Sequence, residues 1–103
     1  MVTEKARLKR GLELGGKPQL DAVVRESTVG DLIEARELSG GDEEQMGIFL
    51  VMGQTVSIGE IEGPFSLELF GKLTTADLEL LQEAAEKADS RGRGIGSDQN
   101  PGD

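Results

Sequence analysis

The sequence predicts a small α+β domain that starts with a β-hairpin and continues in three to four short helices. Apolar and charged residues alternate with a period of two near the N-terminus, whereas capping residues followed by apolar residues at helical spacing recur further along. The length of 103 residues suits one domain. We place this domain at residues 1–88 and expect residues 89–103 to form a disordered tail.

The first expected element is a hairpin over about residues 5–26, with strands near 5–14 and 19–26. The apolar positions of the alternation are Ala6, Leu8, Leu12, Leu14, Leu20, Ala22 and Val24. Arg10 is the one polar residue on this apolar face, and Gly15-Gly16-Lys17-Pro18 provides the turn. Because an isolated hairpin is marginally stable in water, we expect it to pack on helices or on another chain.

Two helices are expected next, at about 29–38 and 42–53. Thr28 followed by Asp31 resembles a capping box, and Ser39-Gly40-Gly41 ends the first helix. Asp42 and the acids after it give a second helix start, which is followed by apolar residues at helical spacing. A strand remains the alternative for the second segment, since Ile48–Val51 is also a β-like run.

The remaining chain is less regular until its last helix. Residues 54–65 contain glycine, proline and scattered apolar residues, and we expect an extended piece or a loop. A short helix at 66–70 is closed by Gly71. Thr74 can cap a helix over about 75–88, whose apolar stripe includes Leu78 and Leu81. The segment 89–103 is rich in glycine and has one apolar side chain, Ile95, so nothing offsets the entropy of ordering it.

The charge balance and the missing residue types exclude several classes of function. The chain has 20 acidic and 11 basic residues, a net charge of −9, and no histidine or cysteine. Residues 1–17 hold five bases against two acids, whereas residues 18–88 hold fifteen acids against four bases. We therefore expect no enzyme, no cofactor and no metal site of the histidine or cysteine kind. The few bases have no aromatic residues among them, which does not favour nucleic-acid binding.

No apolar run is long enough to cross a membrane, and the polar N-terminus lacks the apolar core of a signal peptide, so we expect a cytoplasmic protein. A binding module is the class of protein that remains. A folded part of about 85 residues has a limited core, and we expect another subunit or a client to cover some of its large apolar side chains. The candidate partner-binding residues are Phe49, Met52, Phe65, Phe70, Leu78 and Leu81.

The order of several short segments resembles the tail assembly proteins, or tail assembly chaperones, of Mu-like contractile-tailed phages and prophages. The segments are Arg25-Glu-Ser-Thr-Val-Gly-Asp-Leu32, Glu34-Ala-Arg-Glu37, Gly40-Gly41, Asp42-Glu-Glu-Gln45 and Leu73-Thr-Thr-Ala-Asp-Leu-Glu-Leu-Leu-Gln82. In the first of them the motif positions are Arg25, Thr28, Val29, Gly30, Asp31 and Leu32. The resemblance covers about residues 5–88 and therefore implies that 1–88 is a tail assembly chaperone domain.

The resemblance also implies a function and partners. Such a chaperone covers the long helical tape measure protein, helps to recruit tail tube subunits, and is then released. It acts in the cytoplasm of the host bacterium and is absent from the mature virion. Homo-oligomers are possible. Two alternatives stay open, namely an acidic DNA mimic that inhibits a nucleic-acid-binding protein, and a minor structural subunit of the virion.

Overall fold

The computed structural model describes residues 1–97 and contains one sheet and four helices within that range. The elements, in chain order, are β1 (Thr3–Leu14), β2 (Lys17–Arg25), α1 (Val29–Ser39), α2 (Glu43–Gln54), β3 (Thr55–Ile58), β4 (Ile61–Glu62), α3 (Leu67–Phe70) and α4 (Thr75–Ser97). The strands pair antiparallel in the order β1-β2-β3-β4, so the helical hairpin α1–α2 is inserted between the second and third strands. The α+β class and the N-terminal hairpin are thus confirmed.

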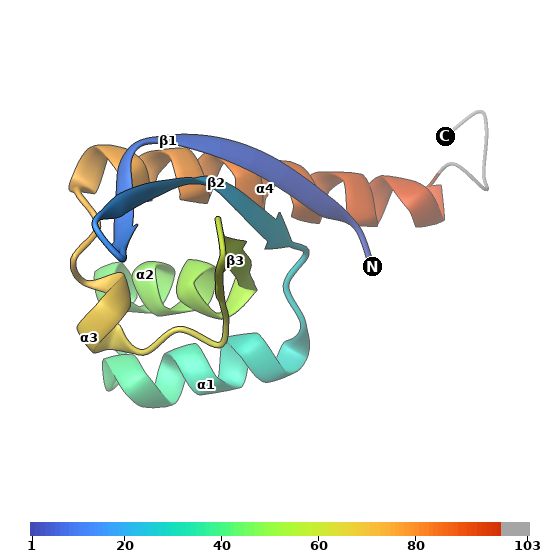
Figure 1. Ribbon diagram of the computed structural model, residues 1–103. Coiled ribbons are helices and arrows are strands. Elements are labelled where there is room, and N and C mark those ends of the chain that lie inside the picture. Colours follow the sequence, from blue (N-terminus) through green and yellow to red (C-terminus); the bar gives the residue numbers. More distant parts are fainter. Residues whose placement is uncertain (98–103) are drawn as a thin grey trace.

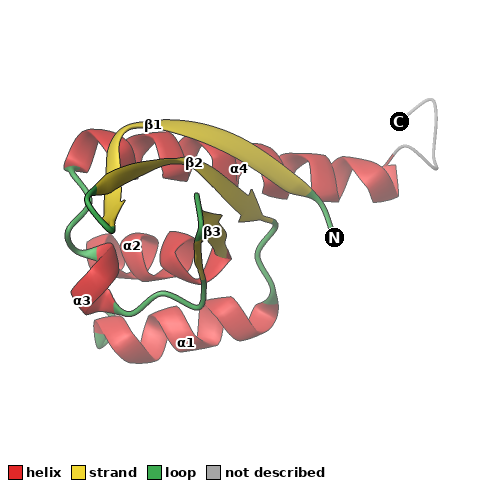
Figure 2. Cartoon of the chain, viewed as in Figure 1, coloured by secondary structure: helices red, strands yellow, loops and turns green. Residues whose placement is uncertain are grey.

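Helices cover one face of this sheet (Figure 1). The long helix α4 runs along β1 and β2, and α2 packs beside α4 against β2 and β3. Colouring by secondary structure shows α1 outside this layer, packed on α2 (Figure 2). The opposite face of the sheet carries the exposed side chains of Lys5, Arg7 and Asp21, together with the half-buried Val23.

The core lies between the sheet, α2 and α4. Its buried residues are Leu8, Leu12, Ala22, Val24, Val51, Met52, Ile58, Phe65, Phe70, Leu81, Ala84 and Ala85. Alanines on α4 allow the helix to approach the strands closely, because they place only a methyl group between the two backbones. The predicted apolar stripe of this helix is therefore the stripe that faces the sheet.

The middle of β1 contains a bulge that the alternating sequence does not predict. Between the pairs Arg7–Asp21 and Leu12–Gln19, β1 advances five residues while β2 advances two. The bulge contains Gly11 at φ 61°, where a Cβ atom would lie 1.8 Å from the Gln19 carbonyl oxygen. The extra residues keep both Leu8 and Leu12 in the core and leave Arg10 exposed, so Arg10 does not interrupt the apolar face as expected.

The carboxylate of Asp77 in the first turn of α4 holds this bulge. Its oxygens accept hydrogen bonds from the backbone N–H groups of Lys9, Arg10 and Gly11, at donor–acceptor distances of 2.7, 3.0 and 2.8 Å. The backbone N–H of Asp77 donates to the Thr74 hydroxyl, the predicted cap. Asp77 is completely buried. One carboxylate therefore joins the N-terminal strand to the C-terminal helix and satisfies amides that the bulge removes from the β ladder.

The last helix is longer than expected. The sequence places its end near Ala88 and a disordered tail from residue 89, but α4 continues to Ser97. Tertiary contacts outweigh the poor helix propensity of the glycines there. Asp89 accepts hydrogen bonds from the N–H and hydroxyl of Ser27, while Arg91 donates to the Thr3 carbonyl oxygen and pairs with Glu4. Residues 98–103 of the expected tail lie outside the described residues.

The structure also decides the two ambiguous segments. The apolar run after Asp42 is the helix α2, and the Asp42 side chain caps it by accepting a hydrogen bond from the N–H of Gln45 at 3.0 Å. The less regular segment 54–65 contains the short strands β3 and β4. Over residues 1–97, no helix combines the length and the apolar character needed to cross a bilayer.

Replacing the buried carboxylate tests its structural role. We expect Asp77→Asn to lower the free energy of unfolding by about 2–4 kcal/mol, because the amide has one acceptor oxygen and turns an NH₂ group towards backbone donors. Urea unfolding followed by circular dichroism measures the change. Asp21→Asn is the matched control, since Asp21 lies in an exposed pair with Arg7 and its loss should cost less than about 0.5 kcal/mol. Equal effects of the two variants would contradict this role.

Candidate partner-binding surfaces

The motif that carries the sequence resemblance builds a structural corner. Two nitrogens of the Arg25 guanidinium donate to the two carboxylate oxygens of Asp31 at 2.7 and 3.0 Å, and one of them also donates to the Gly53 carbonyl oxygen at 2.8 Å. Thr28 and Asp31 form the predicted capping box, each side chain accepting from the other's backbone N–H. These contacts join β2, the start of α1 and the end of α2.

The same contacts shift the pKa values of the groups involved. The Arg25 hydrogen bonds are the largest influence on Asp31 and, with the Thr28 N–H, hold the pKa of this carboxyl below its usual value despite partial burial. Asp31 in turn raises the pKa of Arg25. Burial alone would raise the pKa of Asp77, but the three N–H groups of β1 and Thr74 outweigh it and lower the pKa. Both aspartates are therefore ionised, structural groups.

The six residues expected to bind a partner divide into two sets. Met52, Phe65, Phe70 and Leu81 are 7, 7, 3 and 0% exposed and belong to the core. This chain itself covers most of their surface, which corrects the expectation that they are left for a partner. Phe49 and Leu78 remain partly exposed and pack against the edge of the core. Apolar periodicity alone does not separate these sets, because Met52, Phe70 and Leu81 lie on inward-pointing helix faces just as Phe49 and Leu78 do. Phe65 precedes α3 and belongs to no periodic pattern.

Two adjoining apolar hollows lie between α2, α3 and the start of α4, and together they form what we call the helical groove. Their volumes are about 230 and 220 Å³, and Ile48 and Leu67 line both. The other apolar side chains that line the groove are Phe49, Phe70, Leu73 and Leu78. Leu67 is 52% exposed although it is apolar. The groove thus brings together Phe49 and Leu78, the two predicted residues that stay partly exposed, above the buried Phe70, and it adds Ile48, Leu67 and Leu73.

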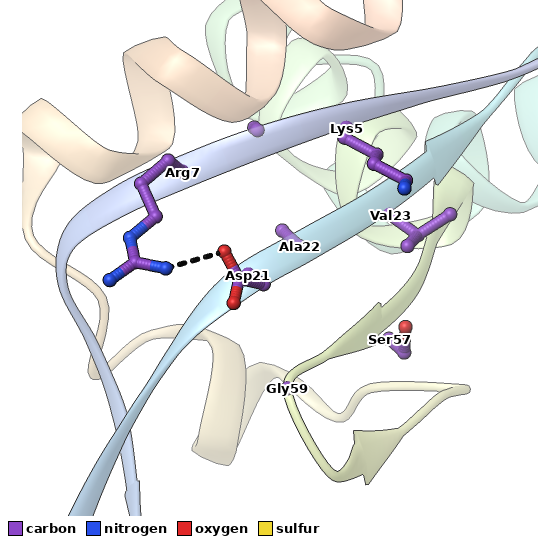
Figure 3. A pocket seen from close by; sticks show the side chains of 8 residues that line it. Lys5, Arg7, Asp21, Ala22, Val23, Ser57 and Gly59 are labelled. Carbon is purple, nitrogen blue, oxygen red and sulfur yellow. Dashed lines mark hydrogen bonds and ion pairs between the residues drawn. The ribbon is translucent and has the colours of Figure 1, made fainter.

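A second depression, the sheet hollow, lies on the uncovered face of the sheet (Figure 3). Its volume is about 630 Å³. Its floor is strand backbone, because Ala6 and Ala22 turn their side chains to the core on the opposite face and Gly59 has no side chain. Lys5 and Arg7 of β1 stand at its edge, and Arg7 pairs with Asp21 at 2.8 Å. The half-buried Val23 is paired in register with Lys5 on one side and Ser57 on the other.

The outer face of α1 is the third candidate surface. Of its residues, this helix buries only Ala35 and Ser39, and its main contact is with α2. Val29 and Ile33, one turn apart, are 74 and 56% exposed. Arg36 and Glu37 follow Ile33 by three and four residues and are exposed on the same face, and Glu34 is exposed at its side. The sequence shows these apolar residues, but it does not show which side of α1 packs on α2. Their exposure therefore cannot be inferred from the sequence alone.

Within residues 1–97, no three acidic side chains gather in an arrangement that could hold a metal ion. The surface features described above are grooves, exposed apolar side chains and charges, all of which suit contact with other proteins.

Comparisons with known proteins agree with the resemblance found in the sequence. A family model described as tail assembly protein gp41 matches residues 8–96. The chain is 33% identical to Mu-like prophage FluMu protein gp41 of Haemophilus influenzae, over 95% of this chain and 94% of that protein. It is 31% identical to the probable tail assembly protein gp41 of Escherichia phage Mu, over 81% of this chain and 69% of the relative. The phage protein FS-gp41 matches equally well but over only 53% of its own length. No solved structure gives a significant match.

The corner built by Arg25 can be tested by a substitution that keeps its charge. We expect Arg25→Lys to lower the free energy of unfolding by about 1–2 kcal/mol, because an ammonium group cannot form the two parallel hydrogen bonds to Asp31 and also reach Gly53. Thermal and urea unfolding measure the loss. Arg7→Lys, in the exposed pair with Asp21, should leave stability unchanged. A comparable loss in both variants would show that the geometry at Arg25 has no special role.

The lowered pKa values of Asp31 and Asp77 predict acid sensitivity. A carboxyl whose pKa is lower in the folded state stabilises the fold above its unfolded pKa of about 3.9, and this stability is lost as pH falls towards the folded pKa. We expect the free energy of unfolding to drop below about pH 4.5, and to drop less steeply in Asp77→Asn. Urea unfolding from neutral pH to about pH 2.5 measures both slopes. Parallel slopes would contradict the assignment to Asp77.

Proposed function

The chain belongs to the family of tail assembly protein gp41, and on that premise we propose that it is a tail assembly chaperone that binds the tape measure protein. In this proposal it covers apolar side chains of the tape measure protein before the tail tube forms, helps to recruit tube subunits, and is then released. It acts in the host cytoplasm and is absent from the mature virion.

The observation that carries this proposal is the helical groove. It offers apolar side chains from three helices, and its hollows have the size of single large side chains rather than of a cofactor. A helical client presents apolar side chains at intervals of three and four residues, which suits two adjoining hollows in a row. Ile48 and Leu67 stand between the hollows and would contact successive client side chains.

Release requires that the contact be weak enough to be displaced. Only a few side chains line the groove, and a contact of this size falls below the area of a standard stable interface. Affinity for a short client segment is then expected in the micromolar range or weaker, and many copies would be needed along a long client. Tube subunits with a larger contact area would then displace the chaperone.

Leu67 is the best position at which to test the groove. We expect Leu67→Asp to weaken binding of the tape measure protein from the same prophage at least tenfold, about 1.4 kcal/mol, since a carboxylate would be buried against apolar client side chains. Because Leu67 is half exposed, the free energy of unfolding should change little. Pull-down and calorimetry with the purified tape measure protein measure the loss of binding.

Val56→Asp is the matched control for this experiment. Val56 is apolar and 42% exposed on β3, and it does not line the groove. Its substitution should leave binding intact. If the wild-type chain fails to bind at tens of micromolar, the chaperone proposal is wrong, whereas equal loss in both variants would place the client elsewhere. Mass spectrometry of purified particles should find none of this chain, and its presence there would instead support a structural subunit.

A further inference from the structure

The sheet hollow and the outer face of α1 are complementary surfaces of the same molecule. The hollow is floored by strand backbone beside Val23, and its edge carries Lys5 and the ion pair of Arg7 with Asp21. The face of α1 has two exposed apolar side chains, Val29 and Ile33, and around them stand two exposed acids, Glu34 and Glu37, against one exposed base, Arg36. A protein of net charge −9 otherwise repels its own copies, so a hollow that carries two bases against one acid is an exception on its surface.

The charges around the sheet hollow and on the outer face of α1 favour contact between these two surfaces. Lys5 forms no ion pair among the residues that the structure describes, and the exposed Lys9 and Arg10 follow on the same strand. Glu34 and Glu37 likewise have no basic partner within the described part of the chain. Such charges gain little in isolation but favour association when they face opposite charges around an apolar contact.

The two surfaces cannot meet within one chain. Helix α1 packs on α2, and in Figure 1 it lies on the opposite side of the molecule from β1, with α2 between them. A contact between them must therefore join two copies. Since each copy carries one hollow on one side and one α1 face on the other, the contact is head-to-tail and leaves a complementary surface exposed at each end.

We propose that α1 of one copy seats in the sheet hollow of a second copy, with Val29 and Ile33 over Val23 and the α1 glutamates near Lys5 and Arg7. The contact extends into an open chain of copies rather than closing as a symmetric dimer. Helix α1 has 11 residues and is about 16 Å long, so the contact is small and the association weak. This surface shares no residue with the helical groove, and the proposal therefore does not depend on tape measure binding.

Sedimentation velocity over a range of concentrations tests the proposal. The wild-type chain should show a mean mass that rises past the dimer as concentration increases towards about 1 mM, and high salt of about 0.5 M should reduce this rise by screening the charges. Lys5→Glu should weaken association at least tenfold by reversing the charge at the hollow. Ile33→Lys should do the same by removing an apolar contact and placing a base against Lys5 and Arg7.

Mixing the two variants distinguishes a head-to-tail contact from other modes. Lys5→Glu retains an intact α1 face and Ile33→Lys retains an intact hollow, so an equimolar mixture should form dimers that cannot grow further. Neither variant alone should associate. The controls Lys17→Glu, at the exposed start of β2, and Leu38→Lys, at an exposed position of α1 outside this face, should associate like the wild type.

Three outcomes would overturn the proposal. A wild-type chain that stays monomeric at about 1 mM and low salt has no such self-contact, and the hollow then belongs to another partner. Association that stops at a dimer, or that the mixed variants do not restore, indicates a different interface. Unfolding curves of each variant, compared with the wild type, separate loss of association from loss of fold. Tape measure binding by Lys5→Glu and Ile33→Lys should remain, which separates a failure here from a failure of the chaperone proposal.

Discussion

The fold depends most on the contact between the Asp77 carboxylate and the bulge in β1. The bulge turns three consecutive N–H groups away from the β ladder, and one buried carboxylate accepts all of them. Because Asp77 also stands in the first turn of α4, the contact fixes where this helix begins relative to the strand. The position of Leu81, one turn further along and fully buried, follows from it. The charge is tolerated in the interior because its hydrogen bonds replace its hydration.

Aspartate side chains also join distant segments elsewhere in the fold. Asp31 joins β2 to α1 through Arg25, and Asp89 accepts from Ser27 at the end of the hairpin. The segments that carry the family resemblance contain Asp31 and Asp77, so their order and spacing record how the fold is held together. In the functions proposed above, partner contacts use side chains that the fold does not need, such as Leu67 in the groove and Ile33 on α1.

The sequence predicts the elements of this fold well because their signals are local. Thr28, Asp42 and Thr74 cap helices where expected, and the period-two pattern marks both long strands. The bulge was missed because its cause lies in Asp77, more than sixty residues away. The continuation of α4 past Ala88 was missed for the same reason, since Asp89 and Arg91 are held by the N-terminal hairpin. Phe65 and Phe70 are buried and Leu67 is exposed because of the way α3 is placed. No pattern in the sequence specifies that placement.

Because the three candidate surfaces are separate, one copy of this chain could contact a long client and neighbouring copies at the same time. The helical groove, the sheet hollow and the α1 face share no residues, so the proposed client binding and the proposed contact between copies would use separate surfaces. Copies bound at neighbouring sites on one client are held at a high effective concentration, so a self-contact too weak to persist in solution becomes populated there. Displacement of one copy from the client would remove the high effective concentration that holds its neighbour. Weak contacts at both surfaces would then give a coat that forms cooperatively on the client and comes apart from an end.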